Sequence, residues 1–375
     1  MILIPITEFC HLNMGQSPDS KTYNTNGQGM PFYQGNADFG EIHPITRIWC
    51  NQPVKTAKKG DILISVRAPI GAMNIAFEDC CIGRGLAALT PKRDVLSKYL
   101  YYAVQSRVSY LISKGTGSTF KAISKKTLEE TLLPAYSFAI QEEIVAKFDK
   151  VESLIADRKR QISCLEQLVK SRFIEMFGTI HNNKFRYEIK TLQDVCEQIK
   201  DGTHQTPIYT EDNVNGYKFL SSKDVTTGRI DWTHLKYIPE ELHNELYARI
   251  APKKGDILLA KNGTTGIAAI VDRDEIFDIY VSLALLRPIE INSVYLWAAI
   301  NSVETKQQFD SSLKGIGVPN LHLGEIKKAR IIVPPIEEQT RFATFIEQVD
   351  KSKFYKQKIL KIYENKLLHK TFYKR

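Results

Sequence analysis

The sequence lacks the short motifs that mark most enzyme active sites. It contains no GxxxxGK[ST] phosphate loop, no HExxH zinc motif and no GxSxG nucleophile elbow. Two glycine pairs, in residues 115–117 and 315–317, do not continue as GxGxxG. The six cysteines include no CxxC pair, and the eight histidines have no metal-ligand spacing. We therefore expect no catalytic residues, no bound metal or cofactor, and reduced, mostly buried cysteines.

Long apolar segments are also missing. No apolar run reaches the roughly 18 residues that a membrane-spanning helix needs. The first five residues, Met1–Pro5, lack the basic start and the long apolar stretch of a signal peptide. These absences predict a cytoplasmic protein.

Basic residues outnumber acidic residues: 51 basic and 42 acidic side chains give a formal net charge of +9. The basic excess lies before residue 138 and after residue 336, whereas the segment between them is nearly neutral. A polyanion such as nucleic acid is the natural partner of a basic protein, and an ordinary basic protein is the alternative. In the neutral part, binding would depend on local clusters such as Lys327-Lys328-Arg330.

The chain repeats itself. The run Lys58–Leu63 returns as Lys253–Leu258, and the segment from Leu86 to Pro91 returns as Leu283 to Pro288. The offset between the copies drifts by only a few residues, which indicates loop insertions within one fold. Two tandem copies predict a pseudo-two-fold molecule, which suits an extended, roughly symmetric ligand.

Each copy has a globular part followed by a helical part. The globular parts, 1–137 and 178–336, combine short β-branched runs and turn signals with helix-like spacing near 97–112 and 293–313, so we expect a mixed α/β (α+β) fold. In each repeated Lys-Gly-Asp sequence we interpret the aspartate, Asp61 or Asp256, as a turn residue before a buried strand.

The helical parts, 138–177 and 337–375, carry apolar residues at steps of four and three, broken by Arg158, Lys353 and Lys356. A narrow apolar stripe, or seam, of this kind is typical of a helix that packs against a partner helix. We therefore expect the two helices to pair as an antiparallel coiled coil that separates the globular domains. The alternative is that each helix packs on its own domain. The predicted seam consists of Ile144, Phe148, Val151, Ile155, Ile162, Leu165, Val169, Ile346, Val349, Leu360, Tyr363 and Leu367.

The two copies agree in their predicted strands and helices and differ where loops are expected, as in residues 29–36 against 216–223. If both copies share one scaffold but carry different loops, each copy would recognise a different target. Polar and basic side chains in such loops are the types that contact base edges and phosphates, although each one is equally expected on an ordinary solvated surface. The candidates for contacting base edges and phosphates are Gln34, Asn36, Arg67, Lys114, Ser118, Lys121, Ser222, Lys223, Lys261, Asn262, Lys314, Asn320 and Lys327.

These residues resemble a known family, the specificity (S) subunits of type I restriction-modification systems. The resemblance covers nearly the whole chain. It is carried by the doubled Gly-Asp-Ile-Leu run, by Leu286-Arg287-Pro288, and by the junction Val333-Pro334-Pro335-Ile336-Glu337-Glu338-Gln339. The first junction, from Leu132 to Val145, is a looser version with one proline missing.

The resemblance implies that 1–137 and 178–336 are target recognition domains, each reading half of a split DNA site, and that 138–177 and 337–375 are spacer helices. It also implies a subunit without catalysis of its own that docks two methyltransferase (M) subunits and is joined by restriction (R) subunits. S-adenosylmethionine and ATP would then be bound by these partners, which methylate adenine and cleave DNA. A two-domain coiled-coil adaptor that binds proteins is the alternative, and a nucleotide-using enzyme would need a cluster of catalytic residues that the sequence does not offer.

Overall fold

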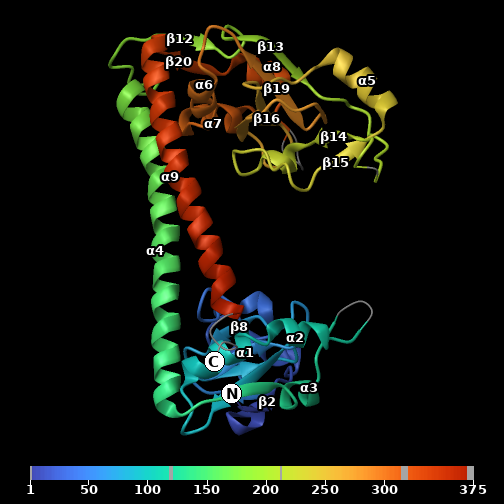
Figure 1. Ribbon diagram of the computed structural model, residues 1–375, viewed down its shortest axis with the longest axis vertical. Helices are drawn as coiled ribbons and strands as arrows, with labels where there is room; N and C mark the ends of the chain where they lie inside the picture. Colours follow the sequence, from blue (N-terminus) through green and yellow to red (C-terminus); the bar gives the residue numbers. More distant parts are fainter. Residues whose placement is uncertain (1, 118–120, 212, 314–319, 370–375) are drawn as a thin grey trace. The chain divides into compact units, whose positions relative to one another are not determined.

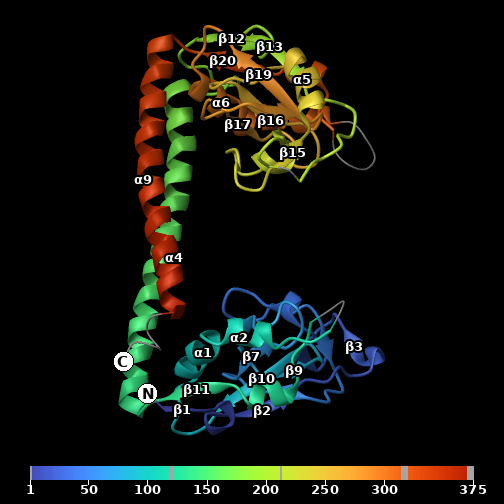
Figure 2. The same ribbon diagram turned by 45° about the vertical axis from the view of Figure 1, so that its right-hand side comes forward.

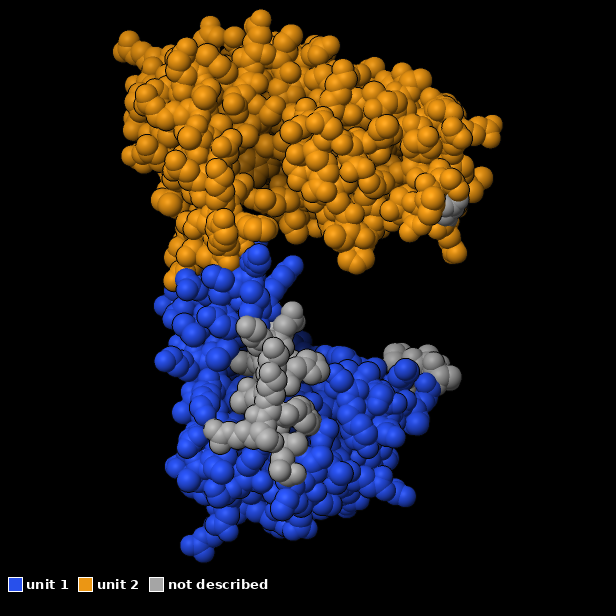
Figure 3. Space-filling view, in the orientation of Figure 1, with its two compact units in different colours: residues 1–160, 357–375 blue, residues 161–356 orange. Residues whose placement is uncertain are grey.

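The computed structural model describes residues 2–117, 121–211, 213–313 and 320–369. The chain forms two compact units, residues 1–160 with 357–375 and residues 161–356 (Figure 3). Each unit contains one copy of the same mixed α/β domain. The expected duplication of a mixed fold is therefore confirmed.

The first domain is built on an antiparallel sheet with the strand order β2-β10-β7-β8. A second sheet has the order β3-β5-β4-β9-β6, and in it β4 and β9 are parallel. Strand β1 pairs with β11 (Figure 2), and β11 leads into the first long helix, which is the long green helix of Figure 1. Its strands are β1 (Ile2–Pro5), β2 (Cys10–Met14), β3 (Tyr23–Asn24), β4 (Met30–Tyr33), β5 (Trp49–Cys50), β6 (Thr56–Ala57), β7 (Ile62–Ser65), β8 (Met73–Ile75), β9 (Cys80–Ile82), β10 (Leu86–Pro91) and β11 (Leu132–Ala135). Its helices are α1 (Ser97–Gln105), α2 (Val108–Ser113) and α3 (Lys125–Glu129), with short 3-10 turns η1 (Ile6–Glu8), η2 (Ser20–Thr22) and η3 (Asn36–Asp38).

The second domain repeats this plan. Its main sheet has the order β13-β19-β16-β17, β12 pairs with β20, and β14 and β18 are parallel. It differs from the first domain mainly in the segment between β14 and β16, which holds β15 and α5. Its strands are β12 (Glu188–Thr191), β13 (Cys196–Asp201), β14 (Tyr217–Leu220), β15 (Lys236–Ile238), β16 (Ile257–Ala260), β17 (Ala268–Ile270), β18 (Phe277–Ile279), β19 (Leu283–Pro288) and β20 (Arg330–Val333). Its helices are α5 (Glu240–Arg249), α6 (Ser293–Ile300), α7 (Val303–Ser312) and α8 (Leu323–Lys328), with the 3-10 turn η4 (Ser222–Val225).

The repeated Lys-Lys-Gly-Asp sequence forms the same turn in both domains. Gly60 and Gly255 have φ angles of +89° and +92°, a region that favours glycine. The carboxylate of Asp61 accepts a hydrogen bond from the Lys58 N–H at 2.8 Å, and Asp256 does the same for Lys253. The interpretation of both aspartates as turn residues is confirmed. The strands that follow, β7 and β16, are buried along their whole length.

A glutamine ties each long helix to its own domain. The long helices are α4 (Phe138–Phe177) and α9 (Ile336–His369). Gln339 is 1% exposed; its Oε1 accepts from the Asn292 N–H at 2.8 Å and its Nε2 donates to the Pro334 carbonyl at 2.7 Å. Gln141 makes the equivalent contact with the Leu96 N–H at 3.0 Å. The repeated glutamine therefore attaches each long helix to its own domain by hydrogen bonds.

The beginning of α4 packs on the first domain itself. Ile144 and Phe148 belong to the buried core of that domain, and the Phe148 ring stacks on Tyr102 at 4.4 Å. We had expected both residues to pair with the other long helix, and for them this expectation is wrong. The physical reason is that β11 leads almost directly into α4, so the first turns of the helix lie against the sheet that precedes them.

Within residues 161–356 the two long helices lie side by side (Figure 2). The Phe342 ring is 5.6 Å from Phe173 and 5.5 Å from Phe177, and farther along α9 Lys353 Nζ donates to Glu166 Oε1 at 2.8 Å. Lys356 Nζ reaches Gln161 Oε1 at 2.9 Å. These contacts run in opposite order along the two helices. The lysines that interrupt the apolar seam thus find polar partners on the facing helix.

The other predicted seam residues are at least partly buried, except for one whose side chain lies outside the described part. Ile346 and Val349 are 5% exposed. The half-buried members are Val151, Ile155, Ile162, Leu165, Val169, Leu360 and Tyr363. The side chain of Leu367 lies outside the described residues.

The cysteines are free thiols, and five of them are buried whereas Cys164 is exposed. Burial raises the pKa of Cys10, Cys80 and Cys196 to about 12, so these thiols remain protonated at neutral pH. The expectation of mostly buried cysteines is confirmed.

Candidate nucleic-acid interface

In the first domain, several loops meet at the edge of the main sheet where β7 ends and β10 begins. The Val66 N–H donates to the Gly85 carbonyl at 2.9 Å, and the Gly85 N–H donates to the Gln34 carbonyl at 3.2 Å. The Ile123 N–H donates to the Val66 carbonyl at 2.9 Å. Segments near residues 34, 66, 85 and 123 therefore converge, and we call this the strand-end edge of the first domain.

Most candidate residues of the first domain lie at or beside this edge. Gln34 is exposed at the end of β4, and its Nε2 donates to Ser17 Oγ at 2.9 Å. Asn36 begins η3, just beyond it. Arg67 is exposed and its backbone bridges to Ala122, next to the exposed Lys121.

The other two candidates of the first domain are Lys114 and Ser118. Lys114 caps α2, and its ammonium lies 5.5 Å from the centre of the Tyr110 ring. Ser118 lies outside the described residues.

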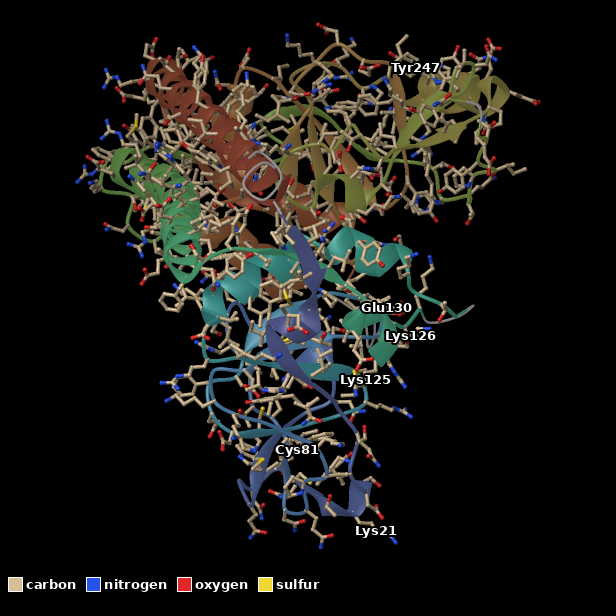
Figure 4. The ribbon with its side chains drawn as sticks, turned by 60° about the horizontal axis from the view of Figure 1, so that its bottom comes forward. Lys21, Cys81, Lys125, Lys126, Glu130 and Tyr247 are labelled. Carbon is tan, nitrogen blue, oxygen red and sulfur yellow. The ribbon has the colours of Figure 1, made fainter. Side chains whose placement is uncertain are left out.

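Two lysines of α3 that the sequence did not single out lie close by in the chain (Figure 4). Lys125 pairs with Glu129 at 3.3 Å and Lys126 pairs with Glu130 at 3.7 Å. All four side chains are well exposed, so the pairs contribute little to stability and partly cancel the local positive charge.

The second domain has the same strand-end edge, with the same backbone pattern. The Lys261 N–H donates to the Ser282 carbonyl at 2.8 Å, and the Leu321 N–H donates to the Lys261 carbonyl at 2.9 Å. The Ser222 N–H donates to Ser282 Oγ at 2.9 Å. Ser222, Lys261 and their neighbours in the chain are therefore gathered at one place, as Gln34 and Arg67 are in the first domain.

The remaining candidates of this domain divide into those at the edge and those elsewhere. Lys223 is exposed in η4, and Asn262 bridges Asn320. Lys314 lies outside the described residues. Lys327 lies away from the edge, because its carbonyl accepts from the N–H of Gln193, which precedes the start of β13, whereas the edge lies at the end of that strand.

Lys261 differs from the other candidates because its side chain is buried. It is 5% exposed, and its Nζ donates to Asp201 Oδ2 at 2.7 Å. Burial raises the pKa of Asp201, but the hydrogen bond and charge of Lys261 outweigh this effect and hold the pKa below its usual value. The structure therefore places Lys261 beneath the surface that it was expected to form.

Asn262 and Asn320 present a different feature. The side-chain oxygen of each is buried and has no hydrogen-bond partner among the described residues. A buried acceptor without a donor costs about 1–3 kcal/mol. Such oxygens are places where a donor from a ligand or water would be accommodated.

Close backbone contact makes a glycine necessary at the start of each edge. A Cβ atom on Gly202 would lie 1.9 Å from the Ile279 carbonyl oxygen, and one on Gly15 would lie 2.2 Å from that of Gly83. Sequence reasoning missed both glycines, as it missed Asp201 and Arg249. The two glycines stand at matching positions of the repeat, directly after β2 and β13, and this match was the available signal.

In the parts of the chain that the structure describes, no group of three or more His, Cys, Asp or Glu side chains could hold a metal ion. Over the same residues, no helix has the length and apolar character to cross a membrane.

The comparisons with known proteins agree on one family. The family described as type I restriction modification DNA specificity domain matches residues 3–167 and 186–364. The putative type I restriction enzyme MjaX specificity subunit of Methanocaldococcus jannaschii is 39% identical over 161 residues, which are 42% of this chain and 37% of that protein. The MjaVIII specificity subunit of the same organism is 26% identical over 271 residues, 67% of this chain. The matched parts thus span 37% and 63% of the lengths of these two relatives.

Among solved structures, the chain is similar to the S subunit of a type I restriction-modification system from M. genitalium. The TM-score is 0.51 at 16% identity, and the alignment covers 100% of this chain and 96% of the other. At this level of identity the similarity supports the fold alone.

Proposed function

Because the chain belongs to the family of type I restriction-modification DNA specificity domains, we propose that it is the specificity subunit of such a system and reads a bipartite site on double-stranded DNA. The observation that carries the proposal is the repeated strand-end edge. Both domains keep the same backbone hydrogen bonds there, at Val66 and at Lys261, but surround them with different side chains. One domain would read one half-site and the second domain the other half-site.

Among the candidates, exposed residues at the edges would make the DNA contacts. Arg67, Lys121 and Lys223 are exposed cations that would contact phosphates or guanine, and the exposed Gln34 carries an amide that suits adenine. Asn320 is only half-buried at the edge, and its side-chain oxygen would accept a hydrogen bond from a donor on a base. Lys327, away from the edge, would contribute at most a phosphate contact. These roles are proposals for each residue, and they predict graded effects of substitution.

The long helices would act as a spacer. The opposite order of the contacts at Phe342 and Lys353 supports an antiparallel coiled coil, which we propose continues along the half-buried seam. A helix of 40 residues is about 60 Å long at 1.5 Å per residue. The length of the paired helices would then set the gap between the half-sites.

We further propose that the chain has no catalysis of its own and docks two methyltransferase subunits, which are joined by restriction subunits. Exposed apolar side chains on the long helices support such docking, because a face of this kind is expected at an interface. Phe354 is 62% exposed and Tyr355 is 65% exposed on α9. S-adenosylmethionine and ATP would be bound by the partners.

The test is selection of DNA from a random duplex pool by the full chain, followed by sequencing of the bound molecules. The proposal expects two short conserved half-sites separated by a fixed gap, and affinity that falls steeply with salt. Replacing residues 1–137 by the first domain of another family member should change one half-site and leave the other. A chain that enriches no sequence would favour the protein-binding adaptor, and half-sites that change together would contradict independent reading.

A further inference from the structure

The second domain contains a buried ion pair at its strand-end edge. Asp201, the last residue of β13, is 8% exposed, and Lys261, which directly follows β16, is 5% exposed. Their charged atoms are 2.7 Å apart. Burying two charges is costly, so this pair calls for an explanation beyond chain folding.

The first domain fills the same two positions with apolar side chains. In the strand pairing, Met14 lies opposite Ala87 as Asp201 lies opposite Ala284. Val66 follows β7 as Lys261 follows β16, and the backbone of both residues makes the same two hydrogen bonds. Val66 is 3% exposed and packs in the core of its domain, with Met14 against the same core.

The two domains share a fold but differ in the charge of these two positions. The domain architecture forms with methionine and valine at these positions, so it does not require charges there. Replacement of a buried ion pair by well-packed apolar residues is often neutral or stabilising. What an ion pair supplies, and an apolar contact does not, is directional attachment of the segments that carry the charges.

Three segments are attached in this way. Asp201 leads into the loop 202–206, and His204 Nε2 lies 3.2 Å from Asp201 Oδ2. Arg249, at the end of α5, donates to the carbonyls of Asp201 at 2.5 Å and Gly202 at 3.2 Å. Lys261 begins the loop 261–266, in which the half-buried Asn262 is the next residue.

We propose that Asp201 and Lys261 are positioning residues that set the sequence preference of the second domain. By joining the ends of β13 and β16, the pair fixes where loops 202–206 and 261–266 leave the sheet, and with them the orientation of Asn262 toward duplex DNA. This inference rests on the proposed function, because it assumes that the strand-end edge reads DNA. It assigns to Lys261 a role beneath the DNA-contacting surface.

The test exchanges the ion pair for the residues of the first domain. The full chain with Asp201→Met and Lys261→Val is compared with the parent chain by thermal unfolding and by selection from random duplex DNA. We expect a melting temperature close to that of the parent. We also expect the preference for the second half-site over a scrambled one to fall about tenfold or more, with the first half-site unchanged.

A matched control lies at the other end of β16. The buried Asp256 and the half-buried Arg287 form a second ion pair, 2.8 Å apart, and the first domain has Thr90 at the position of Arg287. The control variant Arg287→Thr removes this pair far from the loops. We expect it to lower the melting temperature and leave both half-site preferences unchanged.

The outcomes separate the two proposals. A parent chain that enriches no sequence contradicts the proposed function, and the positioning role falls with it. A parent chain that enriches two half-sites, with an exchanged chain that prefers them equally well, contradicts the positioning role alone. If the exchanged chain does not fold, hydrogen exchange of Asp201→Asn decides: faster exchange confined to 202–206 and 261–266 supports the proposal, and a uniform increase across the domain overturns it.

Discussion

Replacement of Gln339 by methionine tests how much the hydrogen bonds between α9 and the second domain contribute to stability. Methionine has a similar volume but cannot form either hydrogen bond, so Asn292 N–H and the Pro334 carbonyl lose their partner. Each buried group left without a partner costs about 1–3 kcal/mol. Because Asn292 is only half-buried and can gain some solvation, we expect a total loss of about 2–4 kcal/mol in the free energy of unfolding.

The assay is urea unfolding of the second domain. Two of the three tryptophans, Trp232 and Trp297, lie in this domain, so their fluorescence reports its transition. With an m-value of about 2 kcal/mol/M, the expected loss lowers the urea midpoint by about 1–2 M. The control is Gln348→Met, at an exposed position of the same helix, which should change stability by less than about 0.5 kcal/mol. A loss below about 1 kcal/mol for Gln339→Met would refute the reasoning.

Three further predictions concern a buried carboxylate, a surface lysine and the spacer. Burial raises the pKa of Asp278 to about 6, above its ordinary value of 3.8, so its stabilising contribution is present at low pH and is lost as pH rises through about 6. Asn at position 278 cannot ionise, so the free energy of unfolding of Asp278→Asn minus that of the parent should rise by about 2–3 kcal/mol between pH 4 and pH 7. If urea unfolding gives the same difference at both pH values, the prediction is contradicted. Lys223→Ala should weaken binding to selected and scrambled duplexes alike and reduce the salt slope of binding by about one, whereas the exposed Lys351→Ala should leave both unchanged. Insertion of one heptad after Val169 and one after Gln348 preserves the seam and adds about 10 Å, so the selected half-sites should lie about three base pairs farther apart; an unchanged gap would show that the helices do not set it.

Periodicity and repetition made much of the fold predictable. The helix-like spacing near 97–112 and 293–313 corresponds to α1 with α2 and α6 with α7, and the turns at Gly60 and Gly255 follow from their sequence. These features depend on neighbours a few residues apart. The division of the chain into recognition domains and spacers stays a prediction.

Long-range contacts were not predictable in the same way. The sequence made Lys261 a surface candidate because its partner, Asp201, lies 60 residues away and no local pattern links the two. The heptad spacing of Ile144 and Phe148 likewise does not say which surface the seam meets, and in α4 its first turns meet their own domain. The orphaned oxygens of Asn262 and Asn320 depend on a bridge between loops that no sequence period reports.

The comparison of the two copies shows which contacts the fold requires. The glutamines at 141 and 339 are the same, and so are the buried tyrosines Tyr99 and Tyr295, whose hydroxyls donate to carbonyls of the strands before α4 and α9. These shared contacts hold each long helix against its sheet. The copies differ at the strand-end edge, where an apolar pair in one domain stands in place of an ion pair in the other. A contact that both copies keep is needed to fold the domain, whereas a costly contact in one copy alone, at the edge where the loops meet, indicates selection for what that edge binds.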